Sequence, residues 1–166
     1  VSHPALNLWR ASSGWKIPEY RALPRQIAKA LSLRLAANEM EALQLVVAPN
    51  VALTNVSVSV SDLRFGSRVI AASEIQVLRV GYVPVTRKTD RTGTLANWPD
   101  PLLPQTASTL LAAGRHHPYW IRVKAPREAT PGIYRGTVTV QAEGVSVSAG
   151  LNVEVYGFAL PDTLTC

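Results

Sequence analysis

The chain has 166 residues, of which 47% are hydrophobic and 17% are charged, and this composition is typical of one folded domain. No apolar run approaches the roughly 20 residues that a helix needs to cross a membrane, so we expect no membrane partner. The first residues show no charged start followed by an apolar run, and no secretion signal is therefore visible. Cys166 is the single cysteine, which excludes an internal disulfide and a metal site built from several thiolates.

The chain is basic, with 17 lysines and arginines against 11 acidic residues and a formal charge of +6. These cations are scattered, and only Arg87, Lys88 and Arg91 form a cluster, in a segment that we expect to be a loop. Because no helix is available to enter a groove and no aromatic and basic residues repeat together, we predict no nucleic-acid partner. An acidic glycan, or a role of the charge in solubility, stays open.

The first part of the chain predicts short strands. An apolar stretch from Leu6 to Trp9 indicates an edge strand, and a covering loop with two prolines follows it. Leucines at every second position over 31–35 predict a half-buried strand, which ends at a turn formed by Asn38-Glu39. The next strand is expected from Met40 to Ala48.

Two further strands are expected before the pattern is lost. Valines alternate with serines over 56–61, and β-branched residues return from Glu74 to Val83, where Gly81 indicates a bulge. Between Pro84 and Pro118 the period disappears, and a loop of that length suggests a site. Only Ala107 to Ala113 is compatible with a helical turn.

The last third of the chain has the clearest alternation. Apolar residues occupy every second position from Tyr134 to Ala142 and again from Val145 to Val155, with Glu143-Gly144 between them as a hairpin turn. Upstream, Thr130-Pro131-Gly132 is compatible with a type II turn. Seven to nine short strands in all predict an all-β fold with little helix. The predicted architecture is a two-sheet antiparallel β-sandwich, immunoglobulin-like or jelly-roll-like, with a closed barrel as the alternative.

Several motifs in one order resemble a known family. They are Leu8 to Ser13, Asn38 to Gln44, Val80 to Val85, Trp98 to Pro104, Pro118 to Ile121 and Pro131 to Gly136. Together they resemble the N-terminal β-sandwich domain of glycoside hydrolase family 123 and of related proteins with domain of unknown function 4091. This resemblance covers nearly the whole chain.

The resemblance implies that a (β/α)8 barrel follows the sandwich and performs the hydrolysis, with N-acetylated amino sugars as substrates in the founding family. Residues 1–160 would then be an accessory domain, and residues 161–166 would begin a linker to a catalytic domain of the same polypeptide. An extracellular or periplasmic location is implied as well. The family's catalytic acidic pair has no matching position here, so we expect no catalytic residues and no cofactor in this segment.

Three tryptophans are the candidate ligand-binding residues. Trp9, Trp15 and Trp98 lie in segments predicted to be irregular, whereas Trp120 begins a strand and is expected in the core. Exposed indoles stack on the apolar faces of sugar rings, and Asp100, Asn97 and Arg115 offer hydrogen bonds to hydroxyl groups. The alternative, which is the more frequent role of such rings, is that they fasten long loops onto the sandwich or pack against the missing domain.

Other polar residues give weaker candidates. Glu39 and Glu41 share one face of a strand at about 7 Å, a separation found between glycosidase carboxylates, but a turn carboxylate explains Glu39 as well. His116 and His117 are adjacent and point to opposite sides of an extended chain, so no metal site is predicted. A modest anionic-ligand patch, made by the cations of strand 121–124 with Arg135, is the remaining possibility.

The function predicted from the sequence is a noncatalytic N-terminal module of a carbohydrate-active protein, which supports a following catalytic barrel and contributes to its substrate cleft. The first alternative is a free-standing carbohydrate-binding module that uses the exposed tryptophans. The second is a small hydrolase that uses Glu39 and Glu41.

Overall fold

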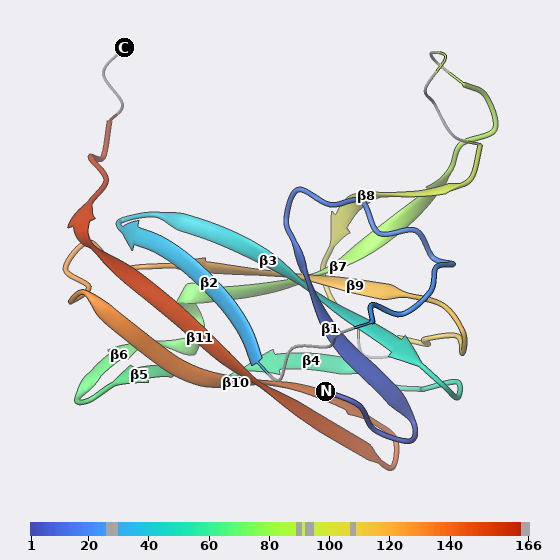
Figure 1. Ribbon diagram of the computed structural model, residues 1–166, viewed down its shortest axis with the longest axis horizontal. Helices are drawn as coiled ribbons and strands as arrows, with labels where there is room; N and C mark the ends of the chain where they lie inside the picture. The colour runs from blue at the N-terminus through green and yellow to red at the C-terminus, as the bar shows by residue number, and fades with distance from the viewer. Residues whose placement is uncertain (26–29, 89–90, 92–94, 107–108, 164–166) are drawn as a thin grey trace.

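The computed structural model describes residues 1–25, 30–88, 91, 95–106 and 109–163. Over these residues eleven strands form two sheets that pack face to face, and the only helical segment is a short 3-10 turn, Ala72–Glu74 (Figure 1). The predicted all-β sandwich with little helix is therefore confirmed.

The first sheet has five strands and is antiparallel throughout. Its strands, in spatial order, are β1 (Leu6–Ser12), β3 (Met40–Pro49), β9 (His117–Lys124), β7 (Ile75–Pro84) and β8 (Asn97–Leu103). The strand expected at Leu6 to Trp9 is β1, and it lies at an edge of the sheet as predicted.

The second sheet has six strands and is mixed. Its main path runs through β2 (Ala30–Ala37), β11 (Val145–Ala159), β10 (Gly132–Ala142), β5 (Leu63–Phe65) and β6 (Arg68–Ile70), and β4 (Ser57–Val60) also pairs with β10. One strand pair departs from the predicted antiparallel arrangement, because β2 pairs with β11 in parallel. The reason lies in the turn after β2. Asn38, at a φ of 62°, leads the chain from this sheet into β3 of the other sheet instead of closing a hairpin.

The core lies between the sheets and follows the predicted alternation. In β11 every second residue from Val147 to Val155 is buried, and the residues between them face outward. The valines of β4 and the leucines of β2 enter the same cluster, together with two buried tyrosines, Tyr119 and Tyr134. Period-two stripes on opposing strands therefore close on one another, as the sequence predicts.

The hairpin and the proline turn have different outcomes. Ala142 and Val145 pair across Glu143-Gly144, with Gly144 at a φ of 71°, so the predicted hairpin is confirmed. The type II turn expected at residues 130–132 is wrong. The turn lies earlier, closed by the Ala129 N–H to the Pro126 carbonyl at 3.0 Å, and Gly132 already begins β10. At Gly132 φ is 153°, and the Phe65 ring lies 2.5 Å from the position of a Cβ, so a larger residue would be strained.

The segment from Pro84 to Pro118 is more regular than expected, because it contains β8. Pro99 and Pro101 are tolerated there since β8 is an edge strand, where a missing N–H breaks no ladder on the outer side. The bulge predicted at Gly81 is confirmed by a register shift between Val80 and Tyr82. Of the helical turn expected over 107–113, residues 107 and 108 lie outside the described residues, and residues 109–113 are not helical.

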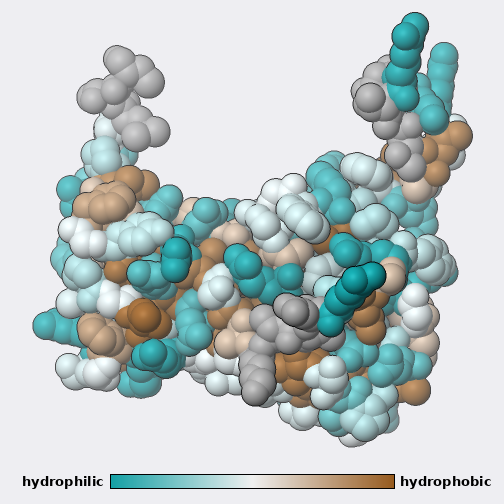
Figure 2. Space-filling model, in the orientation of Figure 1, coloured by the Kyte–Doolittle hydropathy of each residue, from teal (hydrophilic) through white to brown (hydrophobic). Residues whose placement is uncertain are grey.

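Two parts of the chain project from the same side of the sandwich (Figures 1 and 2). One is the end of the β7 and β8 pair, residues 83–88 and 95–98, which we call the arm. The other is the end of β11 with the residues that follow it, which we call the exit. Between the two, the space-filling view shows a broad concave side of the molecule (Figure 2).

Candidate functional site

The loop after β1, residues 13–25, lies across the outer face of the five-stranded sheet, and we call it the strap. Beneath it is a second apolar cluster formed by Trp9, Ala11, Ile17 and Val46. The expectation that Trp9 lies in an irregular segment is wrong, because it belongs to β1 and is only 5% exposed. The guanidinium of Arg21 covers its ring at 4.9 Å, which leaves little of Trp9 for a ligand.

The strap is held by hydrogen bonds to its backbone. The buried Gln44 side chain donates from Nε2 to the carbonyls of Ser12 at 2.8 Å and Trp15 at 2.7 Å. The Tyr82 hydroxyl donates to the Ile17 carbonyl at 2.8 Å, and burial raises the pKa of Tyr82. These bonds hold the backbone on both sides of Trp15, which limits where its exposed side chain can lie.

Trp15 borders a small hollow of about 130 Å³. The ring is 62% exposed, and Trp120 lies in the same hollow, half-buried on the outer face of the sheet and not in the core as expected. The ammonium of Lys16 lies 3.0 Å from the Asp100 carboxylate at the rim. The hollow therefore offers an indole surface beside an exposed ion pair. A ligand ring that has one apolar face and polar groups at its edge could contact both.

Trp98 and Arg115 lie outside this hollow. In the register of β7 and β8, Pro99 pairs with Tyr82, whose hydroxyl contacts the strap, whereas Trp98 pairs with the next residue, Val83, so Trp98 lies on the opposite face. Arg115 lies at the other end of the strap, 3.5 Å from the Glu19 carboxylate and above the ring of Tyr20 at 5.2 Å. Asn97 donates to the same carboxylate at 2.8 Å. Of the predicted ligand-binding residues, the structure thus brings Trp15 together with Asp100 in this hollow, and with the largely buried Trp9 in a neighbouring hollow of about 470 Å³.

Beside Trp9, the imidazole of His116 is buried without hydrogen bonds among the described residues. Its ring meets that of Trp9 edge to face at 5.5 Å, and within the described residues neither ring nitrogen has a hydrogen-bond partner. Burial lowers the pKa of His116 to about 4, and the positive charge of Arg21 and the neighbouring His117 add to this effect. We therefore expect a neutral imidazole that acts as part of the packing under the strap.

The other polar candidates have structural partners. Glu39 accepts the Ala36 N–H at 2.6 Å, and Glu41 accepts the Ala42 N–H at 2.9 Å, so each carboxylate is engaged with nearby backbone. The predicted patch of strand 121–124 with Arg135 does not form, because β9 and β10 belong to different sheets. In the parts of the chain that are described, no three His, Cys, Asp or Glu residues converge as metal ligands would.

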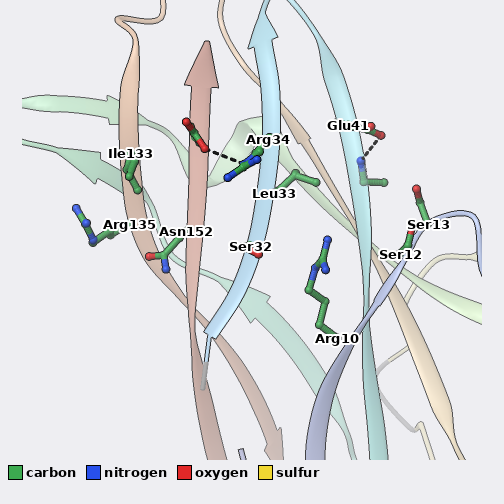
Figure 3. A pocket seen from close by; sticks show the side chains of 12 residues that line it. Arg10, Ser12, Ser13, Ser32, Leu33, Arg34, Glu41, Ile133, Arg135 and Asn152 are labelled. Atoms are coloured by element: carbon green, nitrogen blue, oxygen red, sulfur yellow. Dashed lines mark hydrogen bonds and ion pairs between the residues drawn. The ribbon is translucent and has the colours of Figure 1, made fainter. Parts of the chain in front are cut away.

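Sequence reasoning missed a larger groove of about 560 Å³ that runs from the outer face of the second sheet to the end of β1 (Figure 3). We call it the arginine groove. Its lining residues are Arg10, Ser12, Ser13, Ser32, Leu33, Arg34, Glu41, Ala42, Ile133, Arg135, Asn152 and Glu154. Except for Ser13, which follows β1, they come from five strands whose alignment depends on register, and no local motif in the sequence marks them.

A family model described as the glycoside hydrolase 123 N-terminal domain matches residues 26–142. Among solved structures, a family 123 glycoside hydrolase from Clostridium perfringens, analysed for glycolipid glycan hydrolysis, has a TM-score of 0.76 at 19% identity and is similar over 95% of this chain and 28% of that chain. The sporulation control protein Spo0M from Bacillus subtilis has a TM-score of 0.45 at 10% identity, over 93% of this chain and 51% of that chain. No curated protein matches significantly.

The Clostridium similarity shows a shared fold, and the present chain spans little more than a quarter of that enzyme's length. Among the described residues, the structure has no helix that is both long enough and apolar enough to span a bilayer.

Proposed function

Because the chain belongs to the family of glycoside hydrolase 123 N-terminal domains, we propose that it is a noncatalytic β-sandwich that supports the catalytic domain of a longer carbohydrate-active protein. The observation that carries this proposal is the arrangement of the exit and the arm, which project from one side of the sandwich (Figure 1). A domain that follows the exit would meet the arm on that side.

The direction of the exit is determined by several polar contacts. The Leu160 N–H donates to the Ala37 carbonyl at 2.8 Å, and Asn38 donates from Nδ2 to the Leu160 carbonyl at 3.0 Å and to the Asp162 carboxylate at 2.9 Å. Arg127 also pairs with Asp162 at 2.7 Å. These contacts tie the segment after β11 to the turn between the two sheets, which favours a fixed orientation over a flexible linker.

Exposed apolar side chains occupy both projections. At the exit, the rings of Tyr156 and Phe158 stack with their centroids 5.9 Å apart and their planes at 9°, and Phe158 is 59% exposed. On the arm, Val83, Leu95 and Trp98 are exposed. Large apolar residues gathered on one side of a domain are typical of a surface that another domain covers.

The test uses the polypeptide that extends beyond residue 166. We expect Phe158→Ser to leave the thermal unfolding of the 166-residue chain nearly unchanged, since the ring is exposed there. In the extended protein the same change would expose an interface to water and lower the midpoint by a few degrees, corresponding to about 1–2 kcal/mol. Calorimetry of both proteins measures this difference.

Leu110→Ser is the matched control, because Leu110 is as exposed as Phe158 but belongs to neither projection. It should leave both proteins unaffected. A continuation without a domain of barrel size, or equal losses from the two substitutions in the extended protein, would contradict the supporting role.

A second candidate function is carbohydrate binding by the hollow beside Trp15. It is favoured by the exposed indole of Trp15, whose backbone carbonyl is bonded by Gln44 and which lies in one hollow with the pair of Lys16 and Asp100. We expect neutral oligosaccharides to quench tryptophan fluorescence of the chain, and Trp15→Ala to weaken this binding roughly tenfold, a loss of about 1.4 kcal/mol.

Trp98→Ala serves as the control for the binding candidate, because Trp98 faces away from the hollow and belongs to the arm. Binding that persists in this variant but is lost in Trp15→Ala would identify the hollow. Absence of quenching by every glycan tested, or equal effects of the two substitutions, would remove this candidate and leave the supporting role.

A further inference from the structure

The arginine groove contains a row of polar side chains that strand pairing brings into line. Arg135 of β10 lies opposite Asn152 of β11, and Asn152 lies opposite Ser32 of β2. Neighbouring strands are about 4.8 Å apart, so the row extends roughly 10 Å across the sheet before it reaches the edge at β2. Beyond that edge Arg10 reaches into the groove from β1 of the other sheet, as Figure 3 shows. The Asn152 amide and the Ser32 hydroxyl thus lie in the middle of the row, with Arg135 beyond one of them and Arg10 beyond the other.

A second, parallel row is already paired within itself. Ile133, Glu154 and Arg34 lie opposite one another on the same three strands, and Arg34 bonds Glu154 at 2.8 Å. Arg34 is therefore neutralised by its neighbour.

Arg10 and Arg135 differ from Arg34 in having no acidic partner. Among the described residues neither guanidinium has an ion pair or a side-chain hydrogen bond, and both side chains are exposed in the groove. The carboxylate of Glu41 in the same groove accepts a backbone N–H. The two end positions thus present forked N–H donors that match oxygen anions.

We propose that the arginine groove binds an acidic oligosaccharide, with carboxylate or sulfate groups at Arg10 and Arg135 and sugar hydroxyls at Asn152 and Ser32. The row has two neutral groups, which both donate and accept hydrogen bonds, between two charged donors, and this order suits a chain of hydroxylated rings that carries anionic groups at intervals. A bare inorganic anion would use one arginine only. The groove adjoins the hollow beside Trp15, but neither of its two unpaired arginines lines that hollow, and the proposal does not depend on a following domain.

The shape of the groove supports an extended ligand. Its lining residues extend across β10, β11 and β2 to the ends of β1 and β3 (Figure 3). Ser13 lines both this groove and the hollow beside Trp15, so the two adjoin at the end of β1. The excess of basic over acidic residues in the chain favours approach of a polyanion.

The test is calorimetric titration of the 166-residue chain with three probes: a heparin-derived hexasaccharide, a galacturonic acid hexasaccharide and neutral maltohexaose. We expect binding of at least one acidic probe and none of maltohexaose. The double variant Arg10→Gln, Arg135→Gln should weaken acidic binding at least tenfold, because both charge-assisted contacts are removed. The two acidic probes show whether sulfate or carboxylate groups are preferred.

The matched control is the double variant Arg68→Gln, Arg87→Gln, which removes the same charge from exposed arginines outside the groove. Its affinity should stay within about twofold of the unaltered chain at physiological ionic strength, where distant charges are screened. Equal losses in the two double variants, acidic binding no tighter than that of maltohexaose, or equally tight binding of inorganic sulfate would overturn the proposal. Unchanged melting temperatures exclude unfolding as the cause.

Discussion

Replacing Leu151 with alanine is expected to lower the free energy of unfolding by about 3 kcal/mol. Leu151 is 0% exposed and lies in β11, which is paired on both sides, with Leu31 of β2 and Gly136 of β10 as its direct neighbours. Gly136 has no side chain, and Leu63 fills the space above it, 2.6 Å from the position of a Cβ. Since hydrogen bonds on both edges hold β11 in place, the strands cannot move together to close the cavity.

Urea unfolding followed by circular dichroism measures this loss. Leu110→Ala is the control, because Leu110 is 63% exposed and its truncation should change stability by less than about 0.5 kcal/mol. Similar losses from the two substitutions would mean that the packing between the sheets does not dominate the stability of this domain.

Leu151 also illustrates why so much of the fold could be predicted. Its burial follows from a local property, the alternation of apolar and polar residues along β11, and the hairpin at Glu143-Gly144 follows from the chemistry of two residues. Both depend only on neighbours in sequence. The same reasoning gave the correct positions of β2, β3, β4 and β7 within one or two residues.

The parallel pairing of β2 with β11 depends on contacts distant in sequence and could not be predicted in this way. Residues 31–35 show the same alternation whether their partner is parallel or antiparallel, and the turn at Asn38 resembles a hairpin turn in sequence. β8 was missed for another reason. Its prolines argue against a central strand, and only the finding that it lies at a sheet edge makes them compatible with pairing.

The candidate sites could not be predicted even from a correct strand order, because they also depend on loop positions and strand register. The sequence makes Trp9, Trp15 and Trp98 equal candidates for exposed indoles, but the strap covers Trp9, whereas Trp15 and Trp98 stay exposed. The row from Arg135 to Ser32 exists because three strands have one particular register, and a shift of one residue in β2 would replace Ser32 with a core leucine. Sites whose residues are brought together by the register of neighbouring strands are therefore the part of the molecule that sequence patterns predict least well.

Acidification is expected to destabilise the domain through His116. Its pKa is lowered from 6.5 to about 4 in the folded state, chiefly because the ring is buried, at 4% exposure. The unfolded chain therefore takes up a proton at this residue first as the pH falls. Stability is fully present above about pH 6.5 and is lost progressively down to about pH 4, by an amount on the order of 3 kcal/mol. Chemical denaturation measured at intervals across this range gives the slope.

His116→Phe separates this effect from the titration of the carboxylates. Phenylalanine retains an aromatic ring against Trp9 and cannot be protonated, so the variant should match the unaltered chain near neutral pH and exceed its stability near pH 4.5 by about 2 kcal/mol. His117, whose pKa burial also lowers, is still present in the variant and leaves a smaller slope of the same sign. If the two stability curves run parallel over the whole range, His116 is protonated without cost, and the environment assigned to it beneath the strap is wrong.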